Sequence, residues 1–544
     1  MLPRLRSFML LPSLGLVIAC AADEASRKPV STVQVFKSGA PFRGTNGIMF
    51  GPQGRLWVAS VVTPMLAVLD PESGELLESY GPEDGVKGPD DVAFGPDGSV
   101  YWTDISYGEV GRRAPDGSVT VVGSPGPGVN PITFSDDGRL FVSQCFFGDK
   151  LFEIDPLGKE EPRLITDQLG PGCGLNGMDW GSDDFLYGPR WFAREVVKVD
   201  VDTGQFETVA ADFGVPAAVK FDSRGRLHVL DSLRGEVVRL DGDERTIVGR
   251  VPASSADNLA FDAEDRLFVS SFGDGFIIEV LDADTNRTVS PGGLNMPGGL
   301  ALLNDRLYVA DFFALRGLDA ETAGELYSAR DIIGFSDLGS VMTVATSDAN
   351  LVLTSWFDNT VKLWDPESDS LVAAFEGFGR PIHALAFDGD IVVTEYDTGS
   401  VIRFDPQAPE TRTAIATGLE EPAGLAAAEG ELYVSDRAAG AVFQVIHDGR
   451  LLTPAKKVAV ELAGPEGMAL GADGRLYVVE SAAGRVTSIE TETGARAVVA
   501  EGLELHVPAQ GVFPSTMLFN GIALGENHAF VTGDVHNQIY RIER

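Results

Sequence analysis

One short pattern recurs through almost the whole chain of 544 residues and constrains its fold more than any other feature. In the clearest copy, residues 467–480, an apolar strand leads through the turn Ala472-Asp473-Gly474 into a second strand with apolar residues at alternate positions. Glycine at position 474 supplies the positive φ that a short hairpin turn needs. Related copies follow one another at intervals of about 40 residues. The residues directly before the twelve copies are Asn46, Asp90, Asn130, Asn176, Ala217, Asp257, Gly298, Ser340, His383, Ala423, Glu466 and Asn520.

This period predicts the fold class. A repeat of about 40 residues with about four strands per unit is typical of a β-propeller blade. One closed ring of twelve blades would leave a wide central hole, whereas the centre of a six-bladed ring can be filled by side chains. The sequence therefore predicts an all-β fold of two six-bladed β-propellers in tandem, made of twelve four-stranded repeats.

The last copy lacks an outer strand. It ends after its third strand, residues 538–542, so another part of the chain must complete its sheet. We expect residues 287–290 to take this place, and residues 33–36 to complete the blade that begins at Asn258. The expected domains are propeller 1 at residues 31–283 and propeller 2 at residues 284–544.

The charge of the chain excludes one class of partner. It carries 80 acidic and 42 basic residues, a formal net charge of −38. Such a surface repels phosphate backbones, so we expect no nucleic-acid partner. A solvated acidic surface that keeps the protein soluble explains the same composition.

The N-terminus has the pattern of a targeting segment. An apolar run from Phe8 to Ile18 is too short to span a membrane, and it ends in Leu16-Val-Ile-Ala-Cys20. This ending resembles the lipobox of bacterial lipoproteins, which implies that Cys20 is lipidated and, because Ala21 rather than aspartate follows, that the outer membrane is the address. An ordinary signal peptide with a chance cysteine is the alternative and implies a periplasmic or extracellular protein. We expect a signal peptide at residues 1–20, a linker at residues 21–30 and no membrane contact besides the lipid anchor.

Two further cysteines lie in connections of neighbouring blades. Cys145 follows the second strand of the third repeat, and Cys173 precedes the first strand of the fourth. These two kinds of connection emerge on the same face of a propeller. In an exported protein a disulfide between them is plausible, and two free thiols are the alternative.

The residues before the inner strands point toward the central channel and suggest a metal site in the first ring. Five of the six are carboxamides or carboxylates, and the sixth is alanine. Oxygen ligands of this kind suit Ca²⁺. Asn and Asp are also common where strands begin, because they hydrogen-bond their own backbone, so a purely structural role is the alternative. The candidate ligands are Asn46, Asp90, Asn130, Asn176 and Asp257.

The repeats resemble those of NHL and SMP-30/gluconolactonase-type propellers over residues 31–544. Val129-Asn130, Leu175-Asn176-Gly177 and Ala256-Asp257-Asn258 match the segments that hold Ca²⁺ in SMP-30, gluconolactonase and paraoxonase-like hydrolases. The resemblance implies a Ca²⁺ ion that polarises an ester or lactone carbonyl, with Asp90 as a ligand or as the base that activates water. The order around the ring departs from that family, which has acids where this chain has Asn46 and Ala217. The alternative is a non-catalytic binding propeller at the cell surface, with protein, peptide or carbohydrate ligands.

Two further groups of residues are candidates for a site. Connections after the second strands of the first ring carry aromatic and basic side chains that could form a pocket wall or pack the seams between blades. In the second ring, His383 and Glu466 could form a base and its partner, although a structural hydrogen bond explains them equally. The predicted pocket wall is Tyr107, Phe146, Arg190 and Trp191, and the predicted second site is His383, Glu466 and Asn520.

Overall fold

A computed structural model of the chain describes residues 31–508 and 513–544. The predicted signal peptide, the lipidation site Cys20 and the linker lie outside these residues. Within the described ranges, no helix has the length and apolar character needed to cross a lipid bilayer.

The described chain is all-β and forms twelve four-stranded antiparallel sheets, as the repeat predicts. Short turns join the strands, and Gly474 adopts φ 75° in the hairpin that best represents the repeat. The second strands are deeply buried where sheets of neighbouring blades cover both of their faces; residues 56–60 are all buried. Two 3-10 helices, η1 (Pro82–Asp84) and η2 (Ser481–Ala483), are the only helical segments in the part that the structure describes.

Six sheets form the first ring. From the inner to the outer strand, the first three are β2 (Thr45–Phe50), β3 (Leu56–Ser60), β4 (Met65–Leu69) and β5 (Leu76–Tyr80); β6 (Pro89–Phe94), β7 (Val100–Asp104), β8 (Glu109–Arg113) and β9 (Val119–Gly123); β10 (Val129–Phe134), β11 (Leu140–Gln144), β12 (Leu151–Ile154) and β13 (Arg163–Thr166). The next three are β14 (Asp179–Trp180), β15 (Leu186–Arg190), β16 (Glu195–Val199) and β17 (Phe206–Ala210); β18 (Pro216–Phe221), β19 (Leu227–Asp231), β20 (Glu236–Asp241) and β21 (Glu244–Arg250); β22 (Ala256–Phe261), β23 (Leu267–Ser271), β24 (Ile277–Val280) and β25 (Asn286–Ser290).

The second ring repeats this arrangement. Its first three sheets are β26 (Leu300–Leu303), β27 (Arg306–Ala310), β28 (Ala314–Asp319) and β29 (Glu325–Arg330); β30 (Thr343–Ser347), β31 (Asn350–Ser355), β32 (Thr360–Asp365) and β33 (Ser370–Phe375); β34 (Pro381–Phe387), β35 (Asp390–Glu395), β36 (Ser400–Phe404) and β37 (Arg412–Ala416). The others are β38 (Pro422–Ala428), β39 (Glu431–Asp436), β40 (Ala441–His447) and β41 (Arg450–Ala459); β42 (Pro465–Leu470), β43 (Arg475–Glu480), β44 (Arg485–Glu490) and β45 (Arg496–Glu501); β46 (Ile522–Leu524), β47 (His528–Gly533), β48 (Gln538–Glu543) and β1 (Val33–Lys37).

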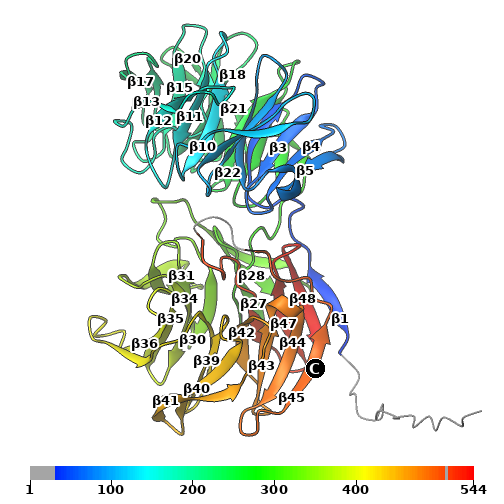
Figure 1. The fold of residues 1–544 in the computed structure, drawn as a ribbon, viewed down its shortest axis with the longest axis vertical. Coiled ribbons are helices and arrows are strands. Elements are labelled where there is room, and N and C mark those ends of the chain that lie inside the picture. The colour runs from blue at the N-terminus through cyan, green and yellow to red at the C-terminus, as the bar shows by residue number, and fades with distance from the viewer. Residues whose placement is uncertain (1–30, 509–512) are drawn as a thin grey trace, which may run out of the picture.

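The inner strands touch one another in two closed cycles. In the first ring β22 lies beside β2, and in the second ring β46 lies beside β26. Each ring is therefore a closed six-bladed propeller with no open inner edge. The two propellers stand one above the other, with the first ring at the top of Figure 1 and the second below it.

The prediction of the closing strands is wrong. β1 pairs with β48 through Val33↔Ile542 and Gln34↔Arg541, so the N-terminal strand completes the last blade of the second ring. β25 pairs with β24, as Ile278↔Thr288 shows, and completes the last blade of the first ring. The reason is local: β25 follows β24 through a tight turn, and short loops cost less conformational entropy to close than long ones. The first ring thus extends to Ser290 rather than to residue 283, and the second ring includes β1.

The chain therefore begins in the second ring, builds the first ring and returns. The two segments that connect the rings lie side by side. The backbone N–H of Ala40 in one donates to the carbonyl of Leu294 in the other at 2.7 Å. Figure 1 shows β1 in the lower propeller beside β48, far from the upper ring that directly follows it in sequence. The two rings are consequently joined by two connecting segments, one after β1 and one after β25.

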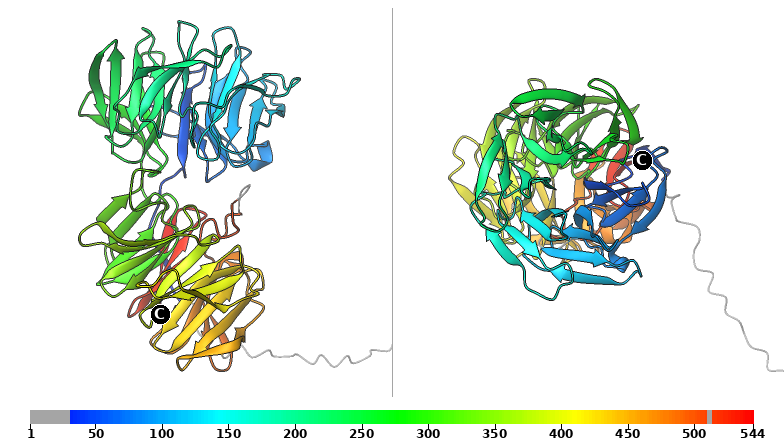
Figure 2. Two further views of the ribbon diagram at one scale, coloured as in Figure 1. Left: turned by 90° about the vertical axis from the view of Figure 1, so that its left-hand side faces the viewer. Right: turned by 90° about the horizontal axis from the view of Figure 1, so that it is seen from above.

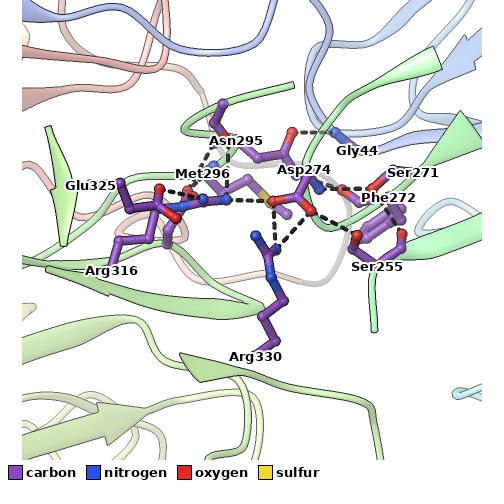
Figure 3. A network of polar contacts seen from close by, with 12 residues as sticks. Gly44, Ser255, Ser271, Phe272, Asp274, Asn295, Met296, Arg316, Glu325 and Arg330 are labelled. Atoms are coloured by element: carbon purple, nitrogen blue, oxygen red, sulfur yellow. Dashed lines mark hydrogen bonds and ion pairs between the residues drawn. The ribbon is translucent and has the colours of Figure 1, made fainter. Parts of the chain in front are cut away.

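A buried network of ion pairs joins the two propeller rings. Asp274, in the connection after β23, accepts hydrogen bonds from Arg316 on β28 and from Arg330 at the end of β29, each at 2.6 Å (Figure 3). Arg316 also donates to Asp311 at 2.6 Å, and Ser255 donates to Asp274 at 2.7 Å. Burial opposes the charge of Asp274, but the two guanidinium groups hold its pKa below the ordinary value. This network fixes how one ring faces the other.

A second contact region lies on the connection between β29 and β30. The indole Nε1 of Trp191 donates to the carbonyl of Ile333 at 2.9 Å. The rings of Phe192 and Phe335 stack with their centroids 6.2 Å apart. Figure 2 shows the two propellers side-on in its left view, and in its right view one ring lying over the other. The mouth of the first ring is thereby covered by loops of the second.

Candidate functional site

A cavity of about 140 Å³ lies where the two rings meet. The first ring supplies the polar residues that precede its inner strands and several apolar side chains. The second ring supplies aromatic and aliphatic side chains from its connecting loops. The lining includes Asn46, Val61, Val62, Asp90, Ile105, Asn130, Phe146, Phe147, Trp191, Asp257 and Phe272 from the first ring, and Phe312, Phe313, Asp331, Ile332, Ile333, Trp356, Phe357, Phe513, Met517 and Leu518 from the second.

The same local feature positions the polar side chains of the first ring. The pairing of β6 with β7 shifts register between Pro89 and Val92, and that of β22 with β23 shifts between Ala256 and Leu259. Equivalent shifts occur around Asn46 and Asn130. A bulge of this kind turns a side chain out of the regular alternation of a strand. It directs these residues to the mouth of the channel, where four of them line one cavity.

Hydrogen bonds join four of the five predicted ligands in two pairs. The Nδ2 of Asn46 donates to the Oδ1 of Asp90 at 3.0 Å. A side-chain hydrogen bond joins Asn176 to Asp257, so Asn176 supports the cluster without lining the cavity. The second oxygen of Asp90, Oδ2, is buried and has no hydrogen-bond partner among the residues that the structure describes. The five predicted ligands are therefore brought together.

The electrostatics of the cluster are unfavourable for two negative charges. Burial raises the pKa of Asp90 well above its ordinary value, and the charges of Asp257 and Asp91 add to this effect. Burial and the charge of Asp91 raise the pKa of Asp257 to about 7, while the hydrogen bond from Asn176 opposes the shift. Near neutral pH, the pair must either retain a proton or hold a cation. Carboxylate and amide oxygens are ligands that a hard divalent cation takes.

Asp91 was not among the predicted site residues. Its Oδ1 accepts from the backbone N–H of Val92 at 2.9 Å and its Oδ2 from that of Ile132 at 3.1 Å. Burial raises its pKa to about 6. The carboxylate bridges two blades and contributes charge to the cluster. Its place directly after Asp90 was the only sequence signal.

The second ring adds two polar atoms to the cavity wall. The Oδ1 of Asp331 and the Nε1 of Trp356 are buried, and neither has a hydrogen-bond partner in the described part of the chain. Both residues line the cavity. Asp331 lies in the connection between β29 and β30, outside the repeated strand pattern, so the repeat did not indicate it.

Two of the four residues of the predicted pocket wall lie at the cavity. Phe146 and Trp191 line the cavity, whereas Tyr107 and Arg190 do not. The Tyr107 ring lies under Lys87, with Nζ 5.3 Å from its centroid. Arg190 donates to the carbonyl of Leu169 at 2.7 Å and to Glu195 at 2.7 Å, so it braces its own blade.

The sequence placed Trp356 and Phe357 on loops of the second ring but did not assign the aromatic residues of that ring to this cavity. Phe312-Phe313 follows β27 and Trp356-Phe357 follows β31. The first ring has the pairs Phe146-Phe147 after β11 and Trp191-Phe192 after β15 at equivalent places. This recurrence of paired aromatic residues after second strands is the signal that would have indicated them.

The residues of the predicted second site do not form one group, because His383 and Glu466 have different hydrogen-bond partners. Glu466 is buried and accepts hydrogen bonds from Arg437 at 2.9 Å, from Ser481 at 2.7 Å and from the backbone N–H of Asn520 at 2.8 Å. His383 instead accepts from the backbone N–H of Leu425 at 3.0 Å, and burial lowers its pKa to about 4. No hydrogen bond or ion pair between His383 and Glu466 is present among the described residues. The histidine is therefore neutral and structural near pH 7.

Cys145 and Cys173 form a disulfide bond. It ties the connection after β11 to the segment before β14, on the face where the cavity lies. Both cysteines are buried in one apolar cluster with Trp191 and Ile332. The bond thus supports the cavity wall around Phe146, which follows Cys145 directly.

Comparison with known proteins gives a likeness of fold only. No protein-family model and no curated protein sequence matches the chain. It is similar to a solved structure of streptogramin B lyase with 17% sequence identity and a TM-score of 0.39, over 52% of this chain and 95% of the lyase. Virginiamycin B lyase from Staphylococcus aureus gives 15% and 0.38, over 52% of this chain and 96% of that one.

The extracellular domain of BT4673 from B. thetaiotaomicron is similar with 11% identity and a TM-score of 0.32, over 94% of this chain and 82% of that domain. These structures are β-propeller proteins. Their identities and scores are too low to carry any inference about function.

Proposed function

We propose that the first ring holds a cation-centred site for a small, largely apolar molecule, which binds in the cavity between the rings. One observation carries this proposal. Three buried polar atoms without partners among the described residues, Asp90 Oδ2, Asp331 Oδ1 and Trp356 Nε1, belong to residues that line the same apolar cavity. Buried polar groups are nearly always hydrogen-bonded in folded proteins, and a few convergent polar groups in an apolar pocket are typical of a ligand site.

The cation of the proposal is Ca²⁺, held by the cluster at the mouth of the first ring. Asp90 and Asp257 would supply the charges, and Asn46 and Asn130 amide oxygens. Asn176 would orient Asp257 through their hydrogen bond. The unpaired Asp90 Oδ2 supports this assignment, since a cation would satisfy that oxygen and remove the repulsion between the two acids. When bound, the ion would polarise a carbonyl oxygen of the ligand.

The activity proposed for this site is hydrolysis of a lactone or related ester. In this activity Asp90, whose Oδ2 has no hydrogen-bond partner among the described residues, would accept a proton from water. The apolar walls would hold the body of the substrate and exclude bulk water. The alternative is binding without catalysis. The enclosed apolar walls favour a small molecule over a carbohydrate or a protein in either case.

The proposed location is the cell envelope. The Cys145–Cys173 disulfide supports it, because such bonds persist in exported proteins and are rare in the cytosol of most organisms. Lipidation at Cys20 remains part of the proposal. Replacing this cysteine, Cys20→Ser, should leave unprocessed precursor or soluble protein in cell fractions. Unchanged processing and membrane retention would remove the anchor from the proposal.

Metal content and thermal stability test the central claim. The purified chain should contain calcium by elemental analysis, and its melting temperature should fall with EDTA and recover with Ca²⁺. Mass action predicts about 2.7 kcal/mol of stabilisation when the ion is at about a hundredfold excess over its dissociation constant. Asp90→Asn and Asp257→Asn should abolish this difference, whereas Asp243→Asn, at an exposed position of the same ring, should not.

An assay with γ- and δ-lactones tests the activity. Hydrolysis should disappear with EDTA, return with Ca²⁺ and be lost in Asp90→Asn. Calcium binding without any hydrolysis would leave the binding function. A protein that melts identically with and without chelator and contains no metal would overturn the proposal of a cation-centred site.

A further inference from the structure

Asp331 is a buried acid at the side of the cavity that the second ring supplies. Asp331 is 3% exposed, and its Oδ1 has no hydrogen-bond partner in the described residues. The other oxygen, Oδ2, accepts one long hydrogen bond from the hydroxyl of Ser340 at 3.4 Å. A buried carboxylate is costly unless a positive group or several donors compensate it.

The nearby positive groups of this chain are committed elsewhere. Arg330, the preceding residue, binds Asp274 at 2.6 and 2.7 Å in the network between the rings. The ammonium of Lys362 donates to the carbonyls of Asp337 and Leu338, both at 3.0 Å. Asp358 is itself acidic and disfavours a charge on Asp331. The charge of Lys362 favours the ionised form of Asp331, although its ammonium donates to the two carbonyls. A cationic group of a ligand in the cavity would add the direct partner that Asp331 Oδ1 lacks among the described residues.

Aromatic rings surround the same side of the cavity. The backbone N–H of Asp331 donates to the carbonyl of Phe313 at 2.9 Å. The Phe313 ring lies 4.3 Å from that of Phe312 and 5.2 Å from that of Phe272, and Phe312 lies 6.5 Å from Trp356, between ring centroids. All four rings line the cavity. The faces of aromatic rings attract organic cations, most strongly where water is excluded.

We propose that the small molecule bound in this cavity carries a primary or secondary amine, whose ammonium group binds the carboxylate of Asp331 while its apolar body packs among the aromatic rings. This inference rests on the proposed function only in that the cavity binds a small molecule. A metal ion does not suit this end, because one carboxylate among aromatic side chains cannot supply the six to eight oxygen ligands of Ca²⁺. A neutral alcohol could donate one hydrogen bond, but it would leave the charge of Asp331 uncompensated.

The size of the cavity limits the amine. Its volume of about 140 Å³ is close to the roughly 150 Å³ of an engineered protein cavity that binds benzene. One aromatic or aliphatic ring with a short arm is therefore the upper size in this conformation. Benzylamine and benzyl alcohol have nearly the same shape and differ in charge, so they form a matched pair of probes.

Isothermal titration of the full chain with both probes near neutral pH tests the inference. Benzylamine should bind about tenfold more tightly than benzyl alcohol or better, since hydrogen bonds to charged groups are stronger than neutral ones. Asp331→Asn should remove this preference and leave the affinity for benzyl alcohol unchanged. Asp337→Asn, which changes an exposed acid in the same connection, is the control and should keep the preference.

The outcomes separate the two proposals. Equal binding of both probes by the wild-type protein would overturn the amine inference and leave a small-molecule cavity in place. A preference that survives Asp331→Asn in a correctly folded variant would assign the charge recognition to another group and also overturn it. Binding of neither probe would overturn the inference and count against the cavity as a ligand site, whatever the calcium experiments show. The wild-type comparison stands even if the variant does not fold.

Discussion

Glu466 of the second ring and Asp90 of the first occupy the same position in their blades, at the start of an inner strand, and differ in their partners. Glu466 receives hydrogen bonds from Arg437, Ser481 and the backbone of Asn520. Asp90 receives one, from the amide of Asn46, and its Oδ2 has no partner among the described residues. One ring thus neutralises its central acid with its own cation, whereas the other leaves two central acids without a cation.

The difference originates in the connections after the second strands. In the second ring, Arg437 follows β39 and reaches Glu466. At the equivalent place after β11 and β15, the first ring has apolar and aromatic residues, Cys145-Phe146 and Trp191. The repeat therefore forms the same scaffold twice. The residue after the second strand determines whether the acid at the centre of the propeller is paired with an arginine or left without a positive partner.

Removing the cation of the second ring should give the largest effect on stability. Arg437→Met would leave Glu466, which is 2% exposed, without its counter-charge, and we expect a loss of about 3–5 kcal/mol. Urea denaturation measures it. The double variant Arg437→Met/Glu466→Gln should recover much of the loss, because the uncompensated charge is then absent. A single variant as stable as the wild type would mean that Glu466 is protonated in the folded protein, and the contrast between the rings would fail.

Reduction of the disulfide should be the next largest effect and concerns the first ring, since the second ring contains no cysteine. The bond joins residues separated by 28 positions, for which loop closure predicts about 3–4 kcal/mol. Cys145→Ser/Cys173→Ser should lower the unfolding midpoint and weaken ligand binding, because Phe146 adjoins the bond. Addition of reductant to the double variant should change nothing. An unchanged midpoint in the variant would show that the apolar cluster holds this wall alone.

The sequence predicted the repeated parts of the molecule and failed on the parts that are not repeated. The regular spacing of the copies from Asn46 to Asn520 predicted twelve blades. It also predicted that the polar residues of the first ring lie together at the mouth of its channel. The closing strands could not be assigned in this way, because residues 33–37 and 286–290 are both short strands with little to distinguish their partners. Asp331 and Phe513 lie in connections between blades, outside the repeated strand pattern. Their meeting with the first ring depends on how two rigid bodies pack, which no local pattern encodes.

The buried acids at the centre of the first ring should make the stability of the protein depend on pH. Burial raises the pKa of Asp257 from 3.8 to about 7, so between these values the folded protein holds a proton that the unfolded chain has released. Stability in the presence of chelator should therefore fall as the pH rises from about 4 to about 7, by about 1–2 kcal/mol, because Asp257 is partly exposed and shares its titration with Asp90. Asp257→Asn should flatten the profile.

Bound calcium should change this dependence of stability on pH. The ion competes with protons for the same oxygens, so its stabilising effect should be greatest at about pH 8 and smallest at about pH 5. Melting temperatures across this range, with and without Ca²⁺, measure both effects. A chelated protein whose melting temperature rises with pH over the same interval would contradict the sign of the shift and with it the assignment of unpaired acids to the first ring.

The smallest expected effect concerns the contact between the rings. Trp191→Phe keeps the ring in its apolar cluster but removes the hydrogen bond from Nε1 to the carbonyl of Ile333, with an expected loss of about 0.5–1.5 kcal/mol. Trp364→Phe is the matched control, since its Nε1 donates to Tyr327 at 2.8 Å within the second ring. Both should lower stability to a similar extent, but only Trp191→Phe should increase proteolysis of the connection between β29 and β30. Equal proteolysis of the two variants would show that the Asp274–Arg316 network alone sets how the rings meet, and that the first ring is covered without the help of this loop.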